Sequence, residues 1–151
     1  MRQAPQPARL RDVPRLTAIL REFSRTTPWL PHTRSLTTDL ALMARITRAG
    51  WVRMMRDARG AAGFIARDGG RIHALYVHPR ARKSGLGRAM LREAQACCPS
   101  LDLWVAEANT HARAFYAAQG FAEIERGNGA GNDENLAEIR MVWSQREGAT
   151  P

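Results

Sequence analysis

Cysteine is scarce in this chain, and the scarcity argues against two classes of small protein. The sequence of 151 residues contains two cysteines, Cys97 and Cys98, which are adjacent. Neighbouring cysteines cannot easily bridge each other without strained geometry, so we do not expect a disulfide-stapled fold. Cys-x-x-Cys pairs and His/Cys clusters with the spacing of a zinc site are also missing, and we expect no metal site. The two thiols are expected to be small buried or unreactive side chains.

Long hydrophobic runs are missing as well. A helix that crosses a membrane needs about eighteen or more consecutive apolar residues, and the sequence has no such run. The first residues, Met-Arg-Gln-Ala-Pro-Gln-Pro, lack the apolar stretch of a secretion signal. We therefore expect a cytoplasmic protein without a membrane partner.

Acidic residues are few compared with basic ones. The chain has 23 lysine and arginine residues against 14 aspartate and glutamate residues, a formal net charge of +9, and arginine far outnumbers lysine. The positive electrostatic potential that this net charge produces favours an anionic partner. No run of about five or six basic residues with interleaved aromatics is present, which argues against a dedicated nucleic-acid surface. A chain of this length suits one domain that needs no disulfide or metal.

Hydrophobic periodicity predicts a mixed α/β order of elements. Helical spacing begins after Asp12 and again at Leu36, and a proline-containing aromatic segment connects the two helices. The period then changes to two, which predicts three short strands joined by hairpin turns. The elements expected after the second helix are strands over 51–55, 62–66 and 72–77, a helix over 86–97, a strand over 101–105, a helix over 110–119, and strands over 121–125 and 137–143.

The segment from Leu75 to Leu91 has the order of a phosphate-binding turn: an apolar strand, a basic loop with glycines, then the start of a helix. Gly85 and Gly87 would let backbone amides converge on an anion at the helix N-terminus. Four side chains add positive charge to this turn: Arg80, Arg82, Lys83 and Arg88.

Three other interpretations of the glycine loop can be compared with the sequence. A Walker loop needs Lys-Ser/Thr after its last glycine, whereas Lys83 and Ser84 precede the glycines here. A dinucleotide fingerprint needs a third glycine where the chain has Met90. A tight turn that uses glycine for its backbone alone remains an alternative to anion binding.

Two motifs carry a resemblance to a known family. Arg82, Gly85 and Gly87 fit Arg-x-x-Gly-x-Gly, which resembles the acyl-CoA pyrophosphate loop of the GNAT acetyltransferase superfamily. Residues 109–121 resemble a later GNAT motif, Asn-x-x-Ala-x-x-Phe/Leu-Tyr-x-x-x-Gly-Phe, matched by Asn109, Ala112, Phe115, Tyr116, Gly120 and Phe121. The motifs cover about residues 72–121 in family order, so the chain is identified as a member. The first seventy residues resemble the family only in element order.

The resemblance implies a fold and an activity. The fold is α/β, the GNAT (acyl-CoA N-acyltransferase) fold, with a central mixed, mostly antiparallel sheet of about six to seven strands flanked by about four helices. One domain would cover residues 1–145, followed by a disordered tail over 146–151. The implied activity is transfer of the acetyl group of acetyl-CoA to a primary amine, on a small molecule, peptide or protein, by direct attack in a ternary complex. A monomer or a homodimer is expected.

The resemblance also implies the cofactor site. In the family, the strands that match 72–77 and 101–105 splay apart to bind the pantetheine arm, and a backbone amide near Val77 faces the thioester oxygen. Tyr116 matches the residue that protonates the departing thiolate, although an aromatic core residue is the alternative. The residues expected to contact acetyl-CoA are Leu75, Tyr76, Val77, Arg82, Lys83, Ser84, Gly85, Leu86, Gly87, Arg88, Asn109, Ala112, Phe115 and Tyr116.

The general base and the acceptor site are implied less directly. Many family members place a glutamate on a splayed strand, and 71–77 contains none. Glu107 is the candidate base, with His73, an acid of the late polar loop and a water chain as alternatives; Glu107 would otherwise be a solvated loop acid. The residues expected at the acceptor are Trp29, Asn132, Asp133 and Glu134. Trp29 also suits a plug between the first two helices, and a polar hairpin explains the other three equally well.

Two functions of other classes compete with acetyl transfer. A catalytically silent acyl-CoA-binding regulatory module is supported by the missing strand glutamate. Binding or acylation of RNA is supported only by the net charge of +9. The identity of the acceptor and the acyl-chain preference have no signal in the sequence.

Overall fold

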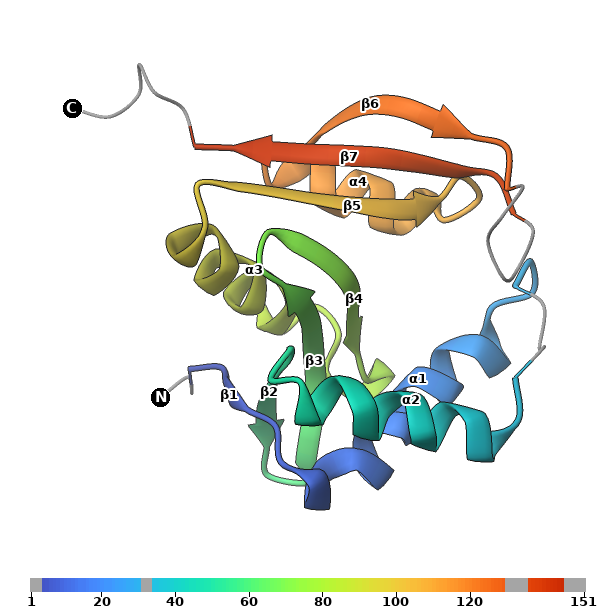
Figure 1. Ribbon diagram of the computed structural model, residues 1–151, viewed down its shortest axis with the longest axis vertical. Helices are drawn as coiled ribbons and strands as arrows, with labels where there is room; N and C mark the ends of the chain where they lie inside the picture. Colours follow the sequence, from blue (N-terminus) through green and yellow to red (C-terminus); the bar gives the residue numbers. More distant parts are fainter. Residues whose placement is uncertain (1–3, 31–33, 130–135, 146–151) are drawn as a thin grey trace.

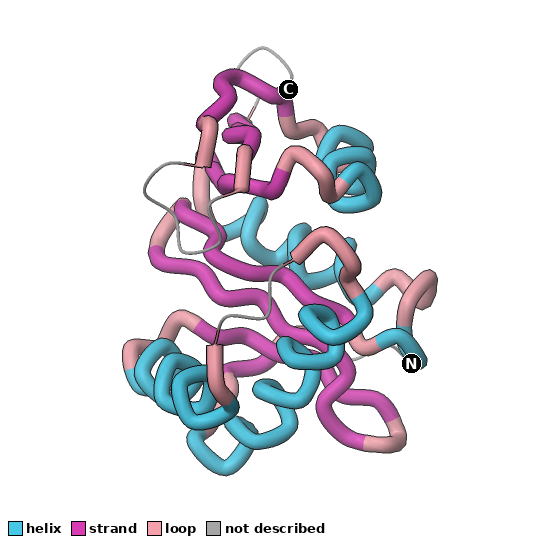
Figure 2. The backbone as a smooth tube through the Cα atoms, turned by 90° about the vertical axis from the view of Figure 1, so that its right-hand side faces the viewer, coloured by secondary structure: helices cyan, strands magenta, loops and turns pink. Residues whose placement is uncertain are grey.

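The computed structural model describes residues 4–30, 34–129 and 136–145, and within these residues a seven-stranded sheet carries helices on both sides (Figures 1 and 2). The elements are β1 (Gln6–Pro7), a 3-10 turn (Leu10–Asp12), α1 (Val13–Thr26), α2 (Leu36–Arg48), β2 (Val52–Asp57), β3 (Gly60–Asp68), β4 (Arg71–Val77), a second 3-10 turn (Pro79–Ala81), α3 (Leu86–Cys97), β5 (Ser100–Ala106), α4 (Thr110–Ala118), β6 (Ala122–Gly127) and β7 (Glu138–Ser144). The α/β prediction with four helices is confirmed.

The order of the strands divides the sheet into two parts. The order is β1-β2-β3-β4-β5-β7-β6, and every neighbouring pair is antiparallel except β4 and β5. These two fully described strands are in register only at Arg71 with Asp102 and at Ile72 with Leu103. Beyond these pairs β4 and β5 diverge, as Figure 1 shows between the β1–β4 part and the β5–β7–β6 part.

A bulge in β4 changes which face its side chains occupy. Ala66 of β3 lies opposite Ala74, but Arg67 lies opposite Ile72, so His73 is an extra residue in the ladder. Ile72 packs in the core under α3, while Ala74 packs against the core under α1 and α2. The His73 ring stacks on Trp51, with centroids 5.0 Å apart and planes at 9°. The bulge therefore turns both His73 and Ala74 toward the α1–α2 side.

Two hydrophobic cores lie on opposite faces of the sheet. The core under α3 and α4 contains Met90, Leu91, Leu101, Leu103, Tyr116, Ile139 and Met141, among others. The core under α1 and α2 includes Leu16, Ile19, Met43, Met54 and Phe64. Helical spacing of the apolar residues of α1 explains this burial, since Val13, Leu16, Ile19 and Leu20 form one stripe on the side that faces β3 and β4. Among the described residues, no helix combines the length and the apolar character that a membrane span requires.

Candidate active site

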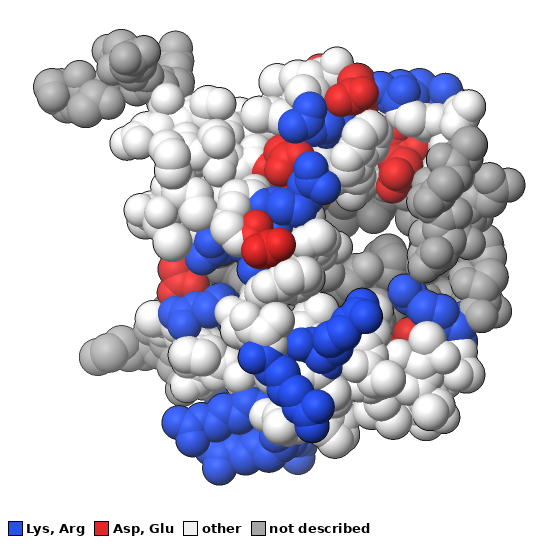
Figure 3. Space-filling model, in the orientation of Figure 1, with Lys and Arg blue, Asp and Glu red and all other residues white. Residues whose placement is uncertain are grey.

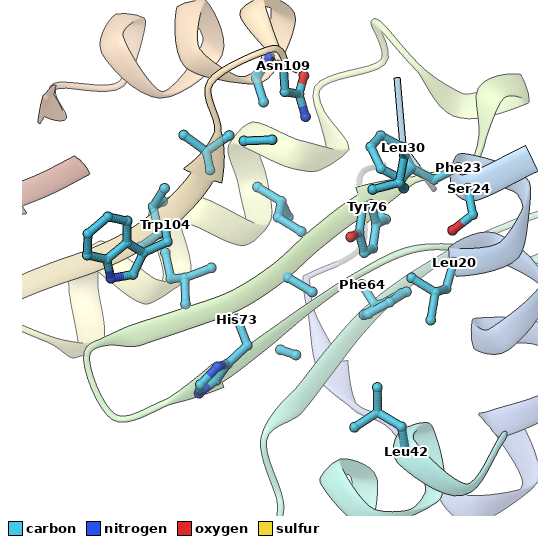
Figure 4. A pocket seen from close by; sticks show the side chains of 18 of the residues that line it. Leu20, Phe23, Ser24, Leu30, Leu42, Phe64, His73, Tyr76, Trp104 and Asn109 are labelled. Carbon is cyan, nitrogen blue, oxygen red and sulfur yellow. Dashed lines mark hydrogen bonds between the residues drawn. The ribbon is translucent and has the colours of Figure 1, made fainter. Parts of the chain in front are cut away.

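A cleft of about 640 Å³ opens where β4 and β5 diverge. Its walls come from α1 and α2 on one side, from β4 and β5 at its base, and from the start of α4 at the far end. Figure 4 shows Tyr76 of β4 beside Phe23 of α1, with Trp104 of β5 and Asn109 across the gap. The cleft thus joins elements from different parts of the sequence, among them α1, α2, β4, β5 and α4.

The edge of β4 that faces the cleft offers backbone groups to a ligand. The amide of His78 donates to the carbonyl of Ala62, at 2.8 Å, on the β3 side. Successive amides of a strand point in opposite directions, so those of Val77 and Leu75 point toward β5, beyond the last registered pair of the two strands. An extended ligand with its own amide groups can pair with this edge.

The loop after β4 has a backbone shape that suits an anion. Lys83 and Gly85 both have positive φ, 65° and 86°, and Gly85 is the N-cap of α3. The Ser84 hydroxyl donates to the carbonyl of Ala81, and the amide of Ala89 donates to the carbonyl of Gly85 at 3.0 Å. The first amides of α3 have no acceptor within the helix, so they are available to an anion at its N-terminus. Gly85 is required here because side chains rarely adopt its φ.

Of the four basic side chains of this loop, three can contact a bound anion, and the fourth is held in an ion pair. Arg82, Lys83 and Arg88 are exposed and make no ion pair with the described residues. Arg80 instead donates two hydrogen bonds to Asp57, at 3.0 and 3.1 Å, and one to the carbonyl of Ala61. This contact lowers the pKa of the Asp57 carboxyl. Arg80 therefore ties the loop to the β2–β3 hairpin and does not add free charge to the turn.

Gly87 and Phe115 connect the loop to α4. A Cβ atom on Gly87 would lie 3.5 Å from Cζ of Phe115 and 3.8 Å from a methyl group of Val77, which is ordinary contact. The close packing of α3, β4 and α4 therefore brings Leu86, Gly87, Val77 and Phe115 together. Most of the predicted cofactor contacts thus lie around one end of the β4–β5 gap.

Asn109 begins α4 as predicted. Its side-chain oxygen accepts a hydrogen bond from the Ala112 amide at 3.1 Å, so the N-cap interpretation is confirmed. Asn109, Ala112 and Tyr116 also line the cleft. The spacing of these residues, three and then four positions, puts them on one face of α4, which borders the cleft.

Tyr116 is a buried phenol at the wall of the cleft. Its side chain is 7 % exposed, and its ring packs between Phe115 and Phe121, with centroid distances of 5.3 and 5.4 Å. Burial raises the pKa of Tyr116, and the nearby Tyr76 raises it further. Desolvation disfavours the phenolate. Tyr116 is therefore neutral at any ordinary pH and presents a proton rather than a charge.

Glu107 lies apart from this site. Its carboxylate accepts two hydrogen bonds from Arg126, at 2.8 and 2.9 Å, on an exposed surface, and it does not line the cleft. The Arg126 hydrogen bonds lower the pKa of Glu107. A carboxylate that is paired and away from the cleft is poorly placed to remove a proton from an acceptor bound there.

The predicted acceptor residues separate into two groups. Trp29 lines the cleft, next to Phe23, with ring centroids 6.4 Å apart in an edge-to-face arrangement. Both interpretations of Trp29 are compatible with this position, since it packs on α1 and also borders the cleft. Asn132, Asp133 and Glu134 lie outside the described residues, as does the predicted tail over 146–151.

Sequence reasoning did not select several residues that line the cleft. They include Arg45, Trp51, Trp104 and Glu138. Glu138 is the cleft's only carboxylate among the residues that the structure describes. No local pattern distinguishes it, because Glu138 and Arg140 read as the polar positions of an ordinary alternating strand. Its place in the cleft follows only from the pairing of β7 with β5.

β4 and β5 part, and the turn after β4 leads into the N-terminus of α3, an arrangement that suits an extended ligand that ends in phosphates. Proteins that need such a site include the acyl-CoA-dependent transferases. The motifs at 82–87 and 109–121 point to the same class. A family model described as the acetyltransferase (GNAT) family matches residues 16–121, and the chain belongs to that family. The resemblance stated from the sequence is thereby confirmed.

Individual relatives agree with this assignment. A peptidyl-lysine N-acetyltransferase, YjaB of Salmonella typhimurium, is 34% identical over 71 residues, which are 47% of this chain and 48% of the relative. The match therefore spans about half the length of that curated relative. The solution structure of apo YjaB from Escherichia coli has a TM-score of 0.77 at 22% identity, over 93% of this chain and 96% of that one.

A second similar structure contains a cofactor. The acetyltransferase yncA from Salmonella typhimurium, solved with acetyl-CoA, has a TM-score of 0.70 at 20% identity, over 98% of this chain and 96% of that one. At such identities the likeness concerns the fold.

Proposed function

We propose that this protein is an acetyl-CoA-dependent N-acetyltransferase that passes the acetyl group to a primary amine by direct attack in a ternary complex. The observation that supports this most strongly is the neutral phenol of Tyr116 on the wall of the gap between β4 and β5. A binding module would need the gap and the anion loop. Only a transferase also needs a proton donor inside the gap.

In this proposal the cofactor crosses the sheet where the strands part. The pyrophosphate binds the amides at the start of α3, with Arg82, Lys83 and Arg88 around it. The pantetheine arm pairs with the free edge of β4 at Leu75 and Val77. Acetyl-CoA supplies the activated thioester, and these backbone groups hold it in one orientation against the acceptor.

Two groups of the chain take part in the acetyl transfer, the amide of Val77 and the phenol of Tyr116. The amine nitrogen attacks the thioester carbon, and the Val77 amide donates to the oxygen that becomes negative. The carbon–sulfur bond breaks, and the sulfur takes the proton of the Tyr116 phenol. The acylated nitrogen loses its extra proton to become the amide, and this proton restores the phenol. The raised pKa of Tyr116 does not prevent this transfer, because burial disfavours a thiolate in the same gap for the same reason.

The acceptor approaches from the α1–α2 side, where Trp29 borders the cleft. A reactive amine must be neutral, so a proton has to leave before attack. Glu107 is badly placed for this step, whereas His73 lines the cleft and stands on the bulge of β4. We therefore assign removal of the ammonium proton to His73, which passes it to solvent.

A catalytically silent acyl-CoA-binding module is the second candidate. The observation in its favour is the position of Glu107, which leaves the cofactor gap without the carboxylate base that the sequence suggested. Such a module would bind acetyl-CoA as tightly as an enzyme does and would release no CoA.

Two measurements separate these functions. The first is the shift in unfolding temperature with acetyl-CoA, CoA, dephospho-CoA and ATP, because a ligand that binds the folded state stabilises it. The second is release of free CoA thiol with a panel of primary amines. Stabilisation by acetyl-CoA with amine-dependent thiol release supports the transferase, and stabilisation without release supports the module. If acetyl-CoA does not stabilise the folded protein, both candidates fail.

A further inference from the structure

Nearly every acidic side chain that the structure describes is neutralised by an arginine. The pairs are Asp12–Arg56, Glu22–Arg25, Asp39–Arg21, Asp57–Arg80, Glu93–Arg53, Asp102–Arg71, Glu107–Arg126, Glu123–Arg113 and Glu125–Arg140. Two described acids have no such partner, Asp68 and Glu138. In a chain with a net charge of +9, an acid that stays unpaired is the exception.

The two unpaired acids occupy very different places. Asp68 is exposed at the end of β3, beside the turn that leads to β4. Glu138 is partly buried at the start of β7 and lines the cleft. Of the two, only Glu138 can meet a ligand that enters the proposed acceptor side.

The strands around Glu138 explain why it is unpaired. Its neighbours across β5 and β6 are Ala106 and Gly127, which cannot donate a hydrogen bond from a side chain. The nearest cation on its own strand face is Arg140, two residues on, which already donates to Asp102 at 3.1 Å and to Glu125 at 3.3 Å. Figure 3 shows basic and acidic side chains side by side over this part of the molecule. The ion-pair network satisfies Arg140 and leaves Glu138 without a cation.

An aromatic ring from the neighbouring row reaches over Glu138's row of residues. Trp104 is registered opposite Arg140, one row away from Glu138. A Cβ atom on Gly127, which is opposite Glu138 on β6, would lie 3.3 Å from Cζ3 of the Trp104 indole. The indole therefore extends from β5 across β7 to β6, over the row that contains Glu138. Both Trp104 and Glu138 line the cleft.

A carboxylate beside an indole is the chemistry that recognises an ammonium group. The carboxylate supplies charge and hydrogen-bond acceptors, and the aromatic face attracts a cation. A cationic ligand needs such a site in this protein, because the net charge of +9 repels cationic molecules from the protein as a whole. A cationic acceptor requires a local anion that the arginines have not neutralised.

We propose that Glu138 and Trp104 form the subsite that selects the ammonium group of the acceptor, and that the acceptor is a primary ammonium on an aliphatic stem, as in a lysine side chain. The stem fits the apolar walls of the cleft, which include Leu20, Phe23 and Leu42. Glu138 is thus a residue that determines acceptor specificity. The inference rests on the proposed function, since it names the class of amine that the same cleft receives.

The test compares one cationic probe with a neutral probe of the same shape. Nα-acetyl-lysine amide and Nα-acetyl-norleucine amide share an aliphatic stem, and only the first carries an ammonium. Binding of each is measured by calorimetry on the wild-type protein saturated with CoA, so that no turnover is needed. We expect the lysine probe to bind about tenfold more tightly than the norleucine probe. We expect Glu138→Gln to abolish that difference.

The matched control is Asp68→Asn, which changes the net charge equally, removes the other unpaired acid and lies outside the cleft. It is expected to keep the preference for the lysine probe. Trp104→Leu should weaken the preference and Trp104→Phe should restore most of it. In turnover, Glu138→Gln should raise the KM of the lysine probe about tenfold and leave the KM of acetyl-CoA unchanged.

A measurement on the wild-type protein alone can overturn the proposal, so the test does not depend on whether the variants fold. Equal binding of the two probes to the CoA-loaded wild type rules out an ammonium subsite. A preference for lysine that survives in Glu138→Gln assigns the site elsewhere. Failure of the proposed function would look different, because then acetyl-CoA would give no thermal stabilisation, or stabilisation without thiol release.

Discussion

Arg71 and Asp102 face each other at the point where β4 and β5 part. Nε and a terminal nitrogen of the guanidinium each lie 2.9 Å from a carboxylate oxygen of Asp102, and the two residues are one of the registered pairs that join these strands. Asp102 also accepts from Arg140 of β7. The ion pair therefore fixes the closed end of the gap and ties both parts of the sheet to one carboxylate.

Asp102→Asn should loosen this junction. The amide keeps the shape of the side chain but loses the charge that holds two arginines. Hydrogen bonds to charged groups contribute about 1.5–3 kcal/mol, with the lower end expected here because both arginines are partly exposed. We expect a loss of that size in the free energy of unfolding, measured in urea, together with weaker stabilisation by acetyl-CoA. Glu123→Gln, which breaks an exposed pair with Arg113, is the control and should change both quantities less. Equal effects of the two variants would contradict a special role for Asp102.

The same carboxylate should make stability depend on acidic pH. Hydrogen bonds from Arg71, and then from Arg140, hold the pKa of Asp102 below its usual value near 4. A carboxyl whose pKa is lower in the folded state stabilises the fold above its unfolded pKa, and this contribution is lost as the pH falls through the folded pKa. Unfolding free energy should therefore fall more steeply below about pH 4 in the wild type than in Asp102→Asn. Parallel curves for the two proteins would rule this out.

Gly85→Ala tests the anion loop. The φ of 86° at Gly85 disfavours any side chain, so the variant must strain or move the loop at the start of α3. Gly69→Ala is a matched control, because Gly69 also has positive φ, 57°, but lies in the β3–β4 turn with open space around it. Both should cost about 1 kcal/mol of stability. Only Gly85→Ala should weaken acetyl-CoA binding in a calorimetric titration, and a loss in both would point to general destabilisation.

Arg88→Gln tests the charge of the same loop. Arg88 lies in the first turn of α3, where a ligand phosphate would lie, and Arg92 is exposed one turn further along the helix. Removing a cation that contacts phosphate should lower acetyl-CoA affinity several-fold and make it less sensitive to salt. Arg92→Gln changes the net charge equally and should leave affinity near the wild-type value. Titrations at two salt concentrations check both expectations.

Tyr116→Phe tests proton donation. The phenyl ring preserves packing against Phe115 and Phe121, so the fold and acetyl-CoA affinity should stay close to wild type. Turnover should fall by about a hundredfold or more, which is the usual scale of a lost general acid. Thiol release under saturating acetyl-CoA measures the effect. Turnover near the wild-type rate would assign Tyr116 to the core alone.

Much of the fold could be predicted because its signals are local. The helix predicted over 86–97 matches α3, and the strand predicted over 101–105 lies within β5, since periodicity, Gly85 and Pro99 mark these elements. The short strand Gln6–Pro7 was not predicted. It has no alternation of its own, and its place depends on pairing with Met54 and Arg53 of β2.

The residues of the candidate site also divide into those that the sequence could predict and those that it could not. Gly85, Asn109 and Tyr116 sit in motifs, so their positions could be anticipated from neighbours in the sequence. Glu107 and Glu138 could not be ranked, because each is an ordinary acid at a strand end. Glu107 pairs with Arg126 outside the cleft, whereas the register of β7 between β5 and β6 places Glu138 in it. Such information exists only after the chain has folded.

The limited pairing between β4 and β5 has a consequence for cooperativity. A sheet normally transmits stability from strand to strand through a continuous ladder, but here the ladder is nearly interrupted in the middle. Amide exchange in the β5–β7–β6 part is therefore expected to be faster without a ligand than with one. A cofactor seated along β4 would pair with the strand edge that β5 leaves open, and it would stabilise both parts of the sheet, which already share the core under α3.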